Sequence, residues 1–467
     1  MNPLAPAWLT EPDDANDLAP LVWPDSIKRT KKGELSVGGM KASKIVEAFG
    51  TPIMVLDEQH VRERAERTRR AFEAAAARHD GSARVYYAGK AFLTTEIARW
   101  MIQAGLNVDV CSRGELETAL AAGVPADRIG FHGNNKSVSE LERAIDVGLG
   151  TIVVDSPIEI ERISAIAERL GTSQRVLVRV RSGVHADTHD FLATAHEDQK
   201  FGFSLEEAES AVARIRELPS VEFVGLHCHI GSQIFGVSGF RESASRVLEL
   251  HERLLEGGPV PLMNLGGGFG IAYTRVDTPA EIEDLADGIV DAVANECAAR
   301  GIEMPALAFE PGRSIIGSAG ITLYEVGTTK PVTVETDDGS ADRLYVAVDG
   351  GMSDNVRPAL YGAQYSARIA SRASDAAPAL ARVVGMHCES GDIVVDNEYL
   401  PGDIVPGDLV AVASTGAYSA AMASNYNHVP RPAVIAVRDG EARVILRGET
   451  INDLLARDTG ITEGLDR

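Results

Sequence analysis

Eight short β-branched runs recur between residues 84 and 310, and each is followed by a longer stretch with helical periodicity. Strands that alternate with helices favour a parallel sheet, and eight such units in about 250 residues match the size of a closed (β/α)8 barrel. We therefore expect an α/β protein with its barrel in residues 51–315. The runs are Arg84–Ala88, Asn107–Cys111, Arg128–Phe131, Thr151–Asp155, Arg175–Arg181, Glu222–Cys228, Pro261–Leu265 and Ala306–Glu310.

The pattern changes after Ser314 to closely spaced strand-like runs, which predict a C-terminal β-rich domain of sandwich or barrel-like build in residues 316–467. Asp439-Gly440, a favoured two-residue turn, separates the last two runs and predicts a closing hairpin. Residues 33–50 are expected to pack with this domain. Residues 1–32 are expected to be an extended arm, poorly ordered at its Pro- and Asp-rich start, with no assigned function. The runs are Ile321–Val326, Arg343–Val348, Leu409–Val412, Ala433–Val437 and Ala442–Leu446.

Charge and cysteine content exclude several classes of partner. A formal net charge of -23 argues against nucleic acid, because that binding depends on clustered Lys and Arg. No stretch approaches the length of a membrane span, and the acidic N-terminus lacks the basic start of a signal peptide. Four cysteines at irregular spacing suit neither a disulfide framework nor a metal motif, so we expect a cytoplasmic protein.

Chemically distinctive residues follow several of the predicted barrel strands. Barrel active sites form on the face where strands end and loops begin. We therefore expect these residues to meet at one mouth of the barrel. They are Lys90, His132, His229, Gly266 to Gly268, and Glu310 to Arg313.

Lys90 stands in Tyr86-Tyr87-Ala88-Gly89-Lys90-Ala91-Phe92, directly after an apolar strand. A lysine at a barrel mouth can condense with an aldehyde cofactor if its surroundings lower its pKa. Taken alone, a strand-end lysine that extends its ammonium into water is the simpler interpretation. The neighbouring motifs favour the cofactor.

Two further motifs follow the last two barrel strands. The Gly266-Gly267-Gly268 turn lets backbone N–H groups approach an anion, although a plain tight loop would look the same. Glu310-Pro311-Gly312-Arg313 offers a carboxylate beside an anion-binding guanidinium, although a local ion pair is common. Their positions on consecutive strand ends allow one phosphate-bearing ring to touch both.

His227 and His229 stand at alternate positions, so both imidazoles are expected on the same side of a strand. A zinc site normally needs three protein ligands, and no third ligand occurs at motif spacing. We therefore predict no metal. An imidazole stacked on a flat ring, with the Ser232 hydroxyl toward a phosphate, accounts better for this segment.

Taken together, the motifs resemble those of the fold-type III pyridoxal-phosphate (PLP) decarboxylases, the alanine racemase and ornithine decarboxylase superfamily. The resemblance extends from about Gly33 almost to the C-terminus, and the motifs of the second domain resemble those of diaminopimelate decarboxylases in order and approximate spacing. The motifs are Tyr87-Ala88-x-Lys90-Ala91, His229-Ile230-Gly231-Ser232-Gln233, Gly266-Gly267-Gly268, Glu310-Pro311-Gly312-Arg313, Asp354-Asn355-Val356-Arg357-Pro358-Ala359-Leu360-Tyr361, Cys388-Glu389-Ser390-Gly391-Asp392 and Thr415-Gly416-Ala417-Tyr418.

The resemblance implies PLP as cofactor and assigns its contacts. Lys90 would hold it covalently, and Glu310 would keep its pyridine nitrogen protonated, as decarboxylation requires. His229 would stack on the ring. The remaining cofactor contacts implied are Ser232, Gly268, Gly312, Arg313 and Tyr418.

The resemblance also implies the substrate, meso-2,6-diaminopimelate, which would be decarboxylated to L-lysine. Arg313, Arg357 and Tyr361 would bind its distal carboxylate, Glu389 its distal ammonium, and Tyr418 both cofactor and substrate. Cys388 would protonate the α-carbon, whereas a free cysteine is more often a small buried hydrophobe.

The expected assembly is a homodimer with shared active sites. Two alternatives stay open: another basic amino acid decarboxylase acting on ornithine, arginine or carboxynorspermidine, and a non-catalytic PLP-binding regulatory relative.

Overall fold

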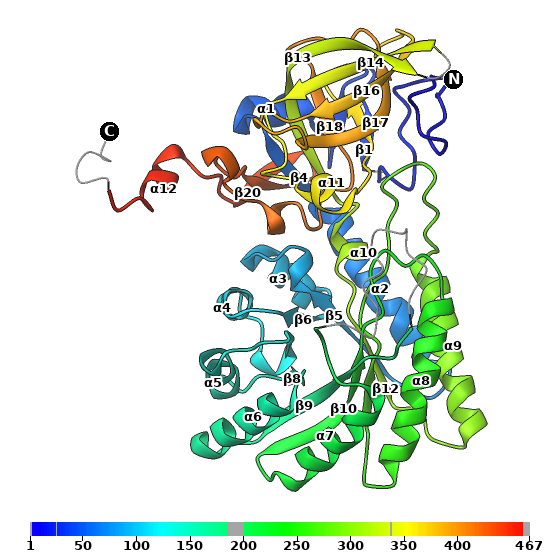
Figure 1. Cartoon of the computed structure of the whole chain (residues 1–467), viewed down its shortest axis with the longest axis vertical. Coiled ribbons are helices and arrows are strands. Elements are labelled where there is room, and N and C mark those ends of the chain that lie inside the picture. Colours follow the sequence, from blue (N-terminus) through cyan, green and yellow to red (C-terminus); the bar gives the residue numbers. More distant parts are fainter. Residues whose placement is uncertain (1, 25, 185–199, 337–338, 461–467) are drawn as a thin grey trace. The chain divides into compact units, whose positions relative to one another are not determined.

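The computed structural model describes residues 2–24, 26–184, 200–336 and 339–460. The chain divides into two compact units (Figure 1). The barrel unit comprises Arg62–Gly270 and Pro279–Ile315, and the sheet unit comprises Met1–Val61, Ile271–Thr278 and Ile316–Arg467.

The barrel unit is a closed ring of parallel strands in the order β10-β11-β12-β5-β6-β7-β8-β9. Each predicted run corresponds to one of these strands, so the predicted (β/α)8 barrel is confirmed. The strands are β5 (Ala83–Ala88), β6 (Asn107–Val110), β7 (Ile129–Phe131), β8 (Thr151–Val154), β9 (Gln174–Val180), β10 (Val221–Cys228), β11 (Leu262–Asn264) and β12 (Ala306–Phe309).

Helices surround the barrel strands in Figure 1, and side-chain caps mark the start of several of them. Ser137 and Glu140 form a capping box at the start of α5, and Ser204 and Glu207 form another at the start of α7. Within the described residues, no helix is both long and apolar enough to span a membrane. The helices are α2 (Glu58–Ala77), α3 (Thr95–Gln103), α4 (Arg113–Ala121), α5 (Val138–Asp146), α6 (Pro157–Leu170), α7 (Leu205–Glu217), α8 (Ser238–Leu255), α9 (Ile282–Arg300) and α10 (Arg313–Ile316), with short 3-10 turns η1 (Gly89–Ala91) and η2 (Ala126–Arg128).

Side chains fill the barrel interior rather than leaving a pore. One buried cluster joins residues from five strands: Tyr86, Val153, Leu177, Leu262 and Ala308. Outside the ring, Phe72 of α2 stacks on Phe309 of β12 with ring centroids 3.8 Å apart. The packed interior leaves the strand ends as the place where a small molecule can reach the barrel.

The sheet unit is built on a mostly antiparallel sheet in the order β17-β16-β14-β13-β4-β19-β20, with β18 pairing β13 and β15. A separate three-stranded sheet has the order β1-β2-β3. The strands are β1 (Ile27–Arg29), β2 (Leu35–Val37), β3 (Met40–Lys41), β4 (Ile53–Asp57), β13 (Gly320–Thr336), β14 (Gly339–Val348), β15 (Ala367–Ile369), β16 (Pro378–Val384), β17 (Ile393–Pro401), β18 (Leu409–Val412), β19 (Val434–Arg438) and β20 (Glu441–Leu446). The helical elements are α1 (Ala42–Phe49), α11 (Arg357–Tyr361) and α12 (Ile451–Leu455), with turns η3 (Ala420–Met422) and η4 (Tyr426–His428).

The predicted C-terminal β domain and its hairpin are confirmed. Strands β19 and β20 pair through Arg438 and Glu441, so Asp439 and Gly440 form the two-residue turn. Both turn residues have positive φ, +53° and +80°, as a type I′ turn requires.

The unit boundaries differ from those expected from the sequence, which began the barrel at residue 51. Strand β4 pairs with β13 and β19 inside the sheet, and all five of its residues are buried. Its apolar run resembles a barrel strand because both are buried on two faces. Residues 271–278 also leave the barrel for the sheet unit.

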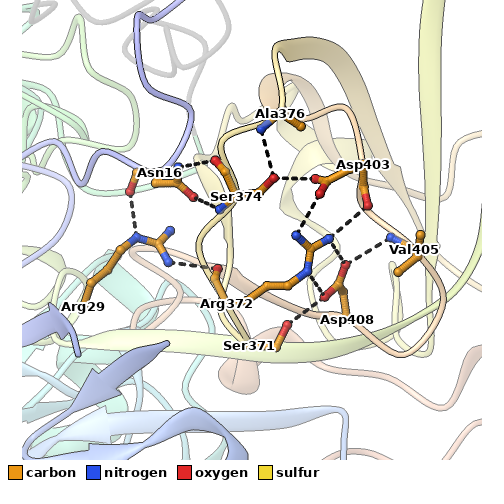
Figure 2. Close-up of polar contacts among 9 residues, drawn as sticks. All are labelled: Asn16, Arg29, Ser371, Arg372, Ser374, Ala376, Asp403, Val405 and Asp408. Carbon is orange, nitrogen blue, oxygen red and sulfur yellow. Dashed lines mark hydrogen bonds and ion pairs between the residues drawn. The ribbon is translucent and has the colours of Figure 1, made fainter. Parts of the chain in front are cut away.

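The N-terminal arm is packed against the sheet unit, which corrects the expectation of a poorly ordered tail. Val22 and Trp23 lie fully within an apolar cluster that also contains residues of β4, β13 and β19. Figure 2 shows the polar contacts: Asn16 exchanges hydrogen bonds with the backbone of Ser374 (2.8 and 3.0 Å), and Arg29 donates to the Asn16 carbonyl (3.0 Å). Burial of these apolar side chains offsets the cost of ordering the segment.

Candidate active site

Polar side chains from several barrel strands meet around the carboxylate of Glu310, which directly follows β12. Nε2 of His227 lies 3.1 Å from Glu310 Oε1, and the Asn264 amide donates to the same oxygen over 2.6 Å. Nε2 of His132 lies 3.4 Å from this oxygen and 3.3 Å from Asp109 Oδ1. Glu310 thus sits at the centre of a buried hydrogen-bond network.

One negative charge is concentrated on Glu310 within this network. Burial alone would raise its pKa, but the opposing effect of His132 and His227 is larger and holds the pKa of this carboxyl well below its usual value. Burial, and next the Glu310 charge, raise the pKa of Asp109 well above its usual value. Burial lowers the pKa of the two imidazoles to about 4, so they are neutral at pH 7.

The loops at the ends of β10, β11 and β12 interlock through glycines. A Cβ on Gly267 would lie 2.1 Å from the Glu310 carbonyl oxygen, and one on Gly268 would lie 2.5 Å from that of Gly231. Ile234 N–H donates to the Gly268 carbonyl (2.9 Å). The Gly266–Gly268 turn is therefore glycine-rich because neighbouring backbones approach it closely.

The same loops hold two groups suited to a flat, phosphate-bearing molecule. Arg313, which is 7% exposed, donates to the Ser232 hydroxyl over 2.8 Å. Nδ1 of His229 accepts from Gly267 N–H (3.3 Å), and burial, followed by the Lys90 charge, lowers the pKa of His229 well below its usual value. A neutral imidazole and a guanidinium-hydroxyl pair thus lie on adjoining loops.

Lys90 lies in the turn η1 that follows β5, and its side chain is exposed. The turn is fixed by the Tyr87 hydroxyl, which donates to the Phe92 carbonyl (2.7 Å), and by Gly89, whose Cβ would lie 2.7 Å from the Asp109 carbonyl oxygen. The Lys90 ammonium also acts electrostatically on Asp109 and His229. The lysine therefore belongs to the same mouth as Glu310.

In the sheet unit, Arg357 opens the short helix α11, and Tyr361 closes it, half-buried. Arg357 is 4% exposed, and its Nη1 donates to the hydroxyls of Tyr273 (2.9 Å) and Tyr365. In the part of the chain that the structure describes, this buried guanidinium is held by two hydroxyls and has no carboxylate beside it.

The loop between β16 and β17 presents Cys388 and Glu389 on the surface of the chain. Beneath them, the buried Asp392 carboxylate accepts hydrogen bonds from the N–H groups of Met352 (2.6 Å) and His387 (2.7 Å). The exposed thiol contradicts the alternative in which Cys388 is a buried hydrophobe. The buried cysteines in this structure are Cys228 and Cys297.

Ser353 joins the three segments that carry the predicted residues of the sheet unit. Its hydroxyl lies 2.9 Å from Nε2 of His387, and its carbonyl accepts from Ser424 N–H (2.8 Å). Tyr418, a few residues before Ser424, has φ +62°, a left-handed conformation that a tyrosine rarely adopts. Such an outlier is a reason to suspect function.

Asp109 and Asn264 were not predicted from the sequence, whereas His132 and Glu310 were expected at one barrel mouth, without a direct contact between them. The signal was available, since Asp109 and Asn264 are polar residues at the ends of apolar barrel strands. No third metal ligand occurs at motif spacing from His227 and His229, but the fold brings ligand atoms of two residues distant in sequence, His132 and Glu310, within 4.8 Å of one another and of His227. Because Glu310 already accepts N–H groups from His227 and Asn264, we interpret the trio as a hydrogen-bonded carboxylate.

Comparison with known proteins agrees with this geometry. The model of the pyridoxal binding domain of pyridoxal-dependent decarboxylases matches residues 58–317. Diaminopimelate decarboxylase of Mycobacterium tuberculosis is 51% identical over 447 residues, covering 94% of this chain and 98% of the relative. The Bacillus subtilis protein of the same name is 41% identical over 442 residues, with 94% and 98% covered.

A solved structure has the same fold over nearly the whole chain. It is diaminopimelate decarboxylase from M. jannaschii in complex with L-lysine, with a TM-score of 0.84 and 32% identity, covering 93% of this chain and 98% of that one. The chain therefore belongs to the diaminopimelate decarboxylases, within the family of pyridoxal-dependent decarboxylases.

Proposed function

We propose that this chain decarboxylates meso-2,6-diaminopimelate to L-lysine and carbon dioxide with PLP as cofactor, the last step of lysine biosynthesis. The observation that carries the proposal is the ionised Glu310 at the barrel mouth, supplied with N–H donors by His227 and Asn264 and accompanied by Lys90 on the adjacent strand end. The names of the relatives, at up to 51% identity, support the substrate.

The donor set fits PLP. Glu310 is an anionic acceptor for a pyridinium N–H, and its lowered pKa keeps it ionised at neutral pH. His229, neutral and flat, suits the face of the ring. Arg313 and Ser232, with the backbone of Gly268 and Gly312, suit a phosphate. Lys90 supplies the amine that an aldehyde cofactor needs.

The chemistry that PLP supplies when bound is an electron sink for the pair left when carbon dioxide departs. Glu310 contributes by holding the proton on the pyridine nitrogen through its carboxylate. His132, His227 and Asn264 orient that carboxylate. Metal is not part of this proposal, so dialysis against a chelator should leave turnover unchanged.

Substrate selection is assigned to charges that match a second amino acid head. Arg313, Arg357 and Tyr361 would bind the distal carboxylate, Glu389 the distal ammonium, and Tyr418 both substrate and cofactor. Ornithine has no distal carboxylate, so it would leave the buried Arg357 guanidinium unpaired. The exposed Cys388 thiol would then deliver a proton to the α-carbon.

We further propose a cytoplasmic homodimer in which the Cys388 loop of one subunit completes the site around Lys90 of the other. Leu360 and Met386, close in sequence to Tyr361 and Cys388, are exposed apolar side chains that a subunit interface at these segments would bury. Mixing inactive Lys90→Ala and Cys388→Ala chains should restore part of the activity, because one hybrid site has both groups intact. Hybrids that form but stay inactive would refute shared sites.

The test of the cofactor assignment is borohydride reduction of the PLP-loaded protein followed by peptide mapping. The pyridoxyl group should be on Lys90, and a label on another lysine refutes the assignment. The test of the reaction is carbon dioxide release from meso-diaminopimelate, ornithine, arginine and lysine. Release mainly from ornithine or arginine would favour a decarboxylase of another basic amino acid, and no release at all would favour a non-catalytic PLP-binding relative.

A further inference from the structure

Among the described residues, the side-chain partners of the buried Arg357 guanidinium are two tyrosines and no carboxylate. Its Nη1 donates to the hydroxyls of Tyr273 and Tyr365. Burial of a lone charge is unfavourable unless it is paired and hydrogen-bonded. The fold therefore holds this guanidinium ready for an anion from outside the described residues.

We propose that Tyr273 and Tyr365 are positioning residues that orient Arg357 so that its Nε and Nη2 bind the substrate's distal carboxylate. This inference rests on the proposed function, in which Arg357 recognises that carboxylate. It extends that function by naming the side chains that set the direction of the arginine.

The hydrogen bonds to the tyrosines involve only one of the three guanidinium nitrogens, Nη1. Nη1 has two hydrogens, and it donates to the hydroxyls of both Tyr273 and Tyr365. None of the hydrogen bonds among the described residues uses Nε or Nη2 of Arg357. A carboxylate binds arginine best through two parallel N–H groups, and Nε with Nη2 is such a pair.

The two rings also confine the guanidinium by their shape. They meet at 80° with centroids 5.1 Å apart, and Cζ of Arg357 lies 4.9 Å from the Tyr273 centroid and 5.6 Å from the Tyr365 centroid. An arginine in such a corner keeps a single orientation. Orientation before binding spares the substrate the cost of ordering the side chain.

The tyrosines cannot follow a moving arginine because the sheet unit holds them. Tyr365 is 1% exposed, and both rings belong to the buried apolar cluster that contains Val346 and Val410. The backbone at Tyr273 is fixed by Asp277, whose Oδ2 accepts from the N–H groups of Tyr273 (2.9 Å) and Thr274 (2.8 Å). The corner is therefore rigid on both sides.

The test uses the PLP-loaded enzyme and the variants Tyr273→Phe and Tyr365→Phe, which keep the rings and remove one hydroxyl each. A buried Nη1 hydrogen then loses its acceptor, so the KM for meso-diaminopimelate should rise about tenfold while kcat changes less. Tyr345→Phe is the matched control. Its hydroxyl accepts from Arg382 Nη1 (3.3 Å) in the same sheet unit, and its kinetics should equal the wild type.

A binding measurement separates orientation of Arg357 from general loosening of the fold. L-Lysine keeps the amino acid head that remains after decarboxylation, whereas cadaverine has no carboxylate. By calorimetric titration, both tyrosine variants should bind L-lysine about tenfold more weakly and bind cadaverine as the wild type does. Equal weakening of both ligands would overturn the proposal.

A double-mutant cycle completes the test. In the Arg357→Ala background, Tyr365→Phe should cause no further loss of kcat/KM, because its target is gone. If Arg357→Ala is strongly impaired while both tyrosine variants keep wild-type KM and L-lysine affinity, the inference is wrong and the role of Arg357 stands. If Arg357→Ala itself is unimpaired, the role proposed for Arg357 is wrong and the inference falls with it.

Discussion

The side-chain amide of Asn264 donates to Glu310 Oε1 over 2.6 Å and accepts, at its own oxygen, the N–H of Gly266 over 2.8 Å. One residue therefore ties the central carboxylate of the barrel mouth to the glycine-rich loop beside it. The first contact arises because β11 and β12 are parallel neighbours that end at the same face, and the second is local to the loop that follows β11.

Glu310→Gln should lower kcat for meso-diaminopimelate by about 10²-fold or more, because an amide cannot stabilise a protonated pyridine nitrogen electrostatically. The melting temperature and the PLP content should change little, since glutamine retains the size and an acceptor oxygen. The measurement is steady-state turnover with cofactor content determined in parallel. A kcat within threefold of wild type would show that the carboxylate does not act on the cofactor.

Gly89→Ala should destabilise the turn that carries Lys90. The added Cβ would lie 2.7 Å from the Asp109 carbonyl oxygen, a backbone atom that cannot move aside cheaply. We expect a loss of about 1–3 kcal/mol in unfolding free energy and weaker PLP binding. Gly114→Ala in α4 is the control, because its Cβ would meet only the Ser112 hydroxyl at 3.8 Å, and it should be neutral or slightly stabilising. Equal stabilities of the two variants would refute the steric argument.

Asp354 should make the sheet unit less stable as pH rises toward neutrality. Burial raises the pKa of Asp354 to about 7, so the folded state keeps this proton while the unfolded chain releases it above about 4. The stabilisation is complete below the unfolded pKa and is lost as pH rises through about 7. In denaturant titrations between pH 5 and 8, Asp354→Asn should show a flatter stability profile than wild type, and identical slopes would contradict the raised pKa.

Much of the barrel was predictable because its signal is local and repeated. Each strand is a short apolar run, and parallel strands bring their ends to one face, so Lys90, His229 and Glu310 could be predicted to share a mouth. The residues of β4, Ile53–Asp57, were placed in the barrel unit without being predicted as a strand, and five buried residues look the same beside a barrel or in the centre of a sheet. Only the pairing of β4 with β13 and β19 identifies it.

The partners of Arg357 could not be predicted. Tyr273 lies 84 positions before it, in a segment that follows a barrel strand but folds with the sheet unit. Nothing in the residues around Tyr273 marks that change of unit. The packing of the N-terminal arm was hidden for a related reason. Its Pro and Asp residues are typical of an unpacked terminus, whereas Val22 and Trp23 pack with strands that lie far away in the sequence.

Trp23→Ala should cost about 3–5 kcal/mol in unfolding free energy of the sheet unit, because Trp23 is 2% exposed in its apolar cluster. Leu21→Ala, two residues earlier and 51% exposed, should change stability by less than about 0.5 kcal/mol. Denaturant unfolding of both variants checks the prediction. If Trp23→Ala lowered the unfolding free energy as little as Leu21→Ala, the arm would not be part of the folded unit.

We expect the site to select a substrate with two amino acid heads, and the ratio of kcat/KM for meso-diaminopimelate to that for ornithine measures this selection. Leaving a buried guanidinium unpaired commonly costs several kcal/mol of binding free energy, so we expect the wild-type ratio to be about 10³ or greater. Arg357→Ala should lower this ratio by at least about 10²-fold while PLP stays bound. A wild-type ratio near one would contradict selection of the distal amino acid head by Arg357.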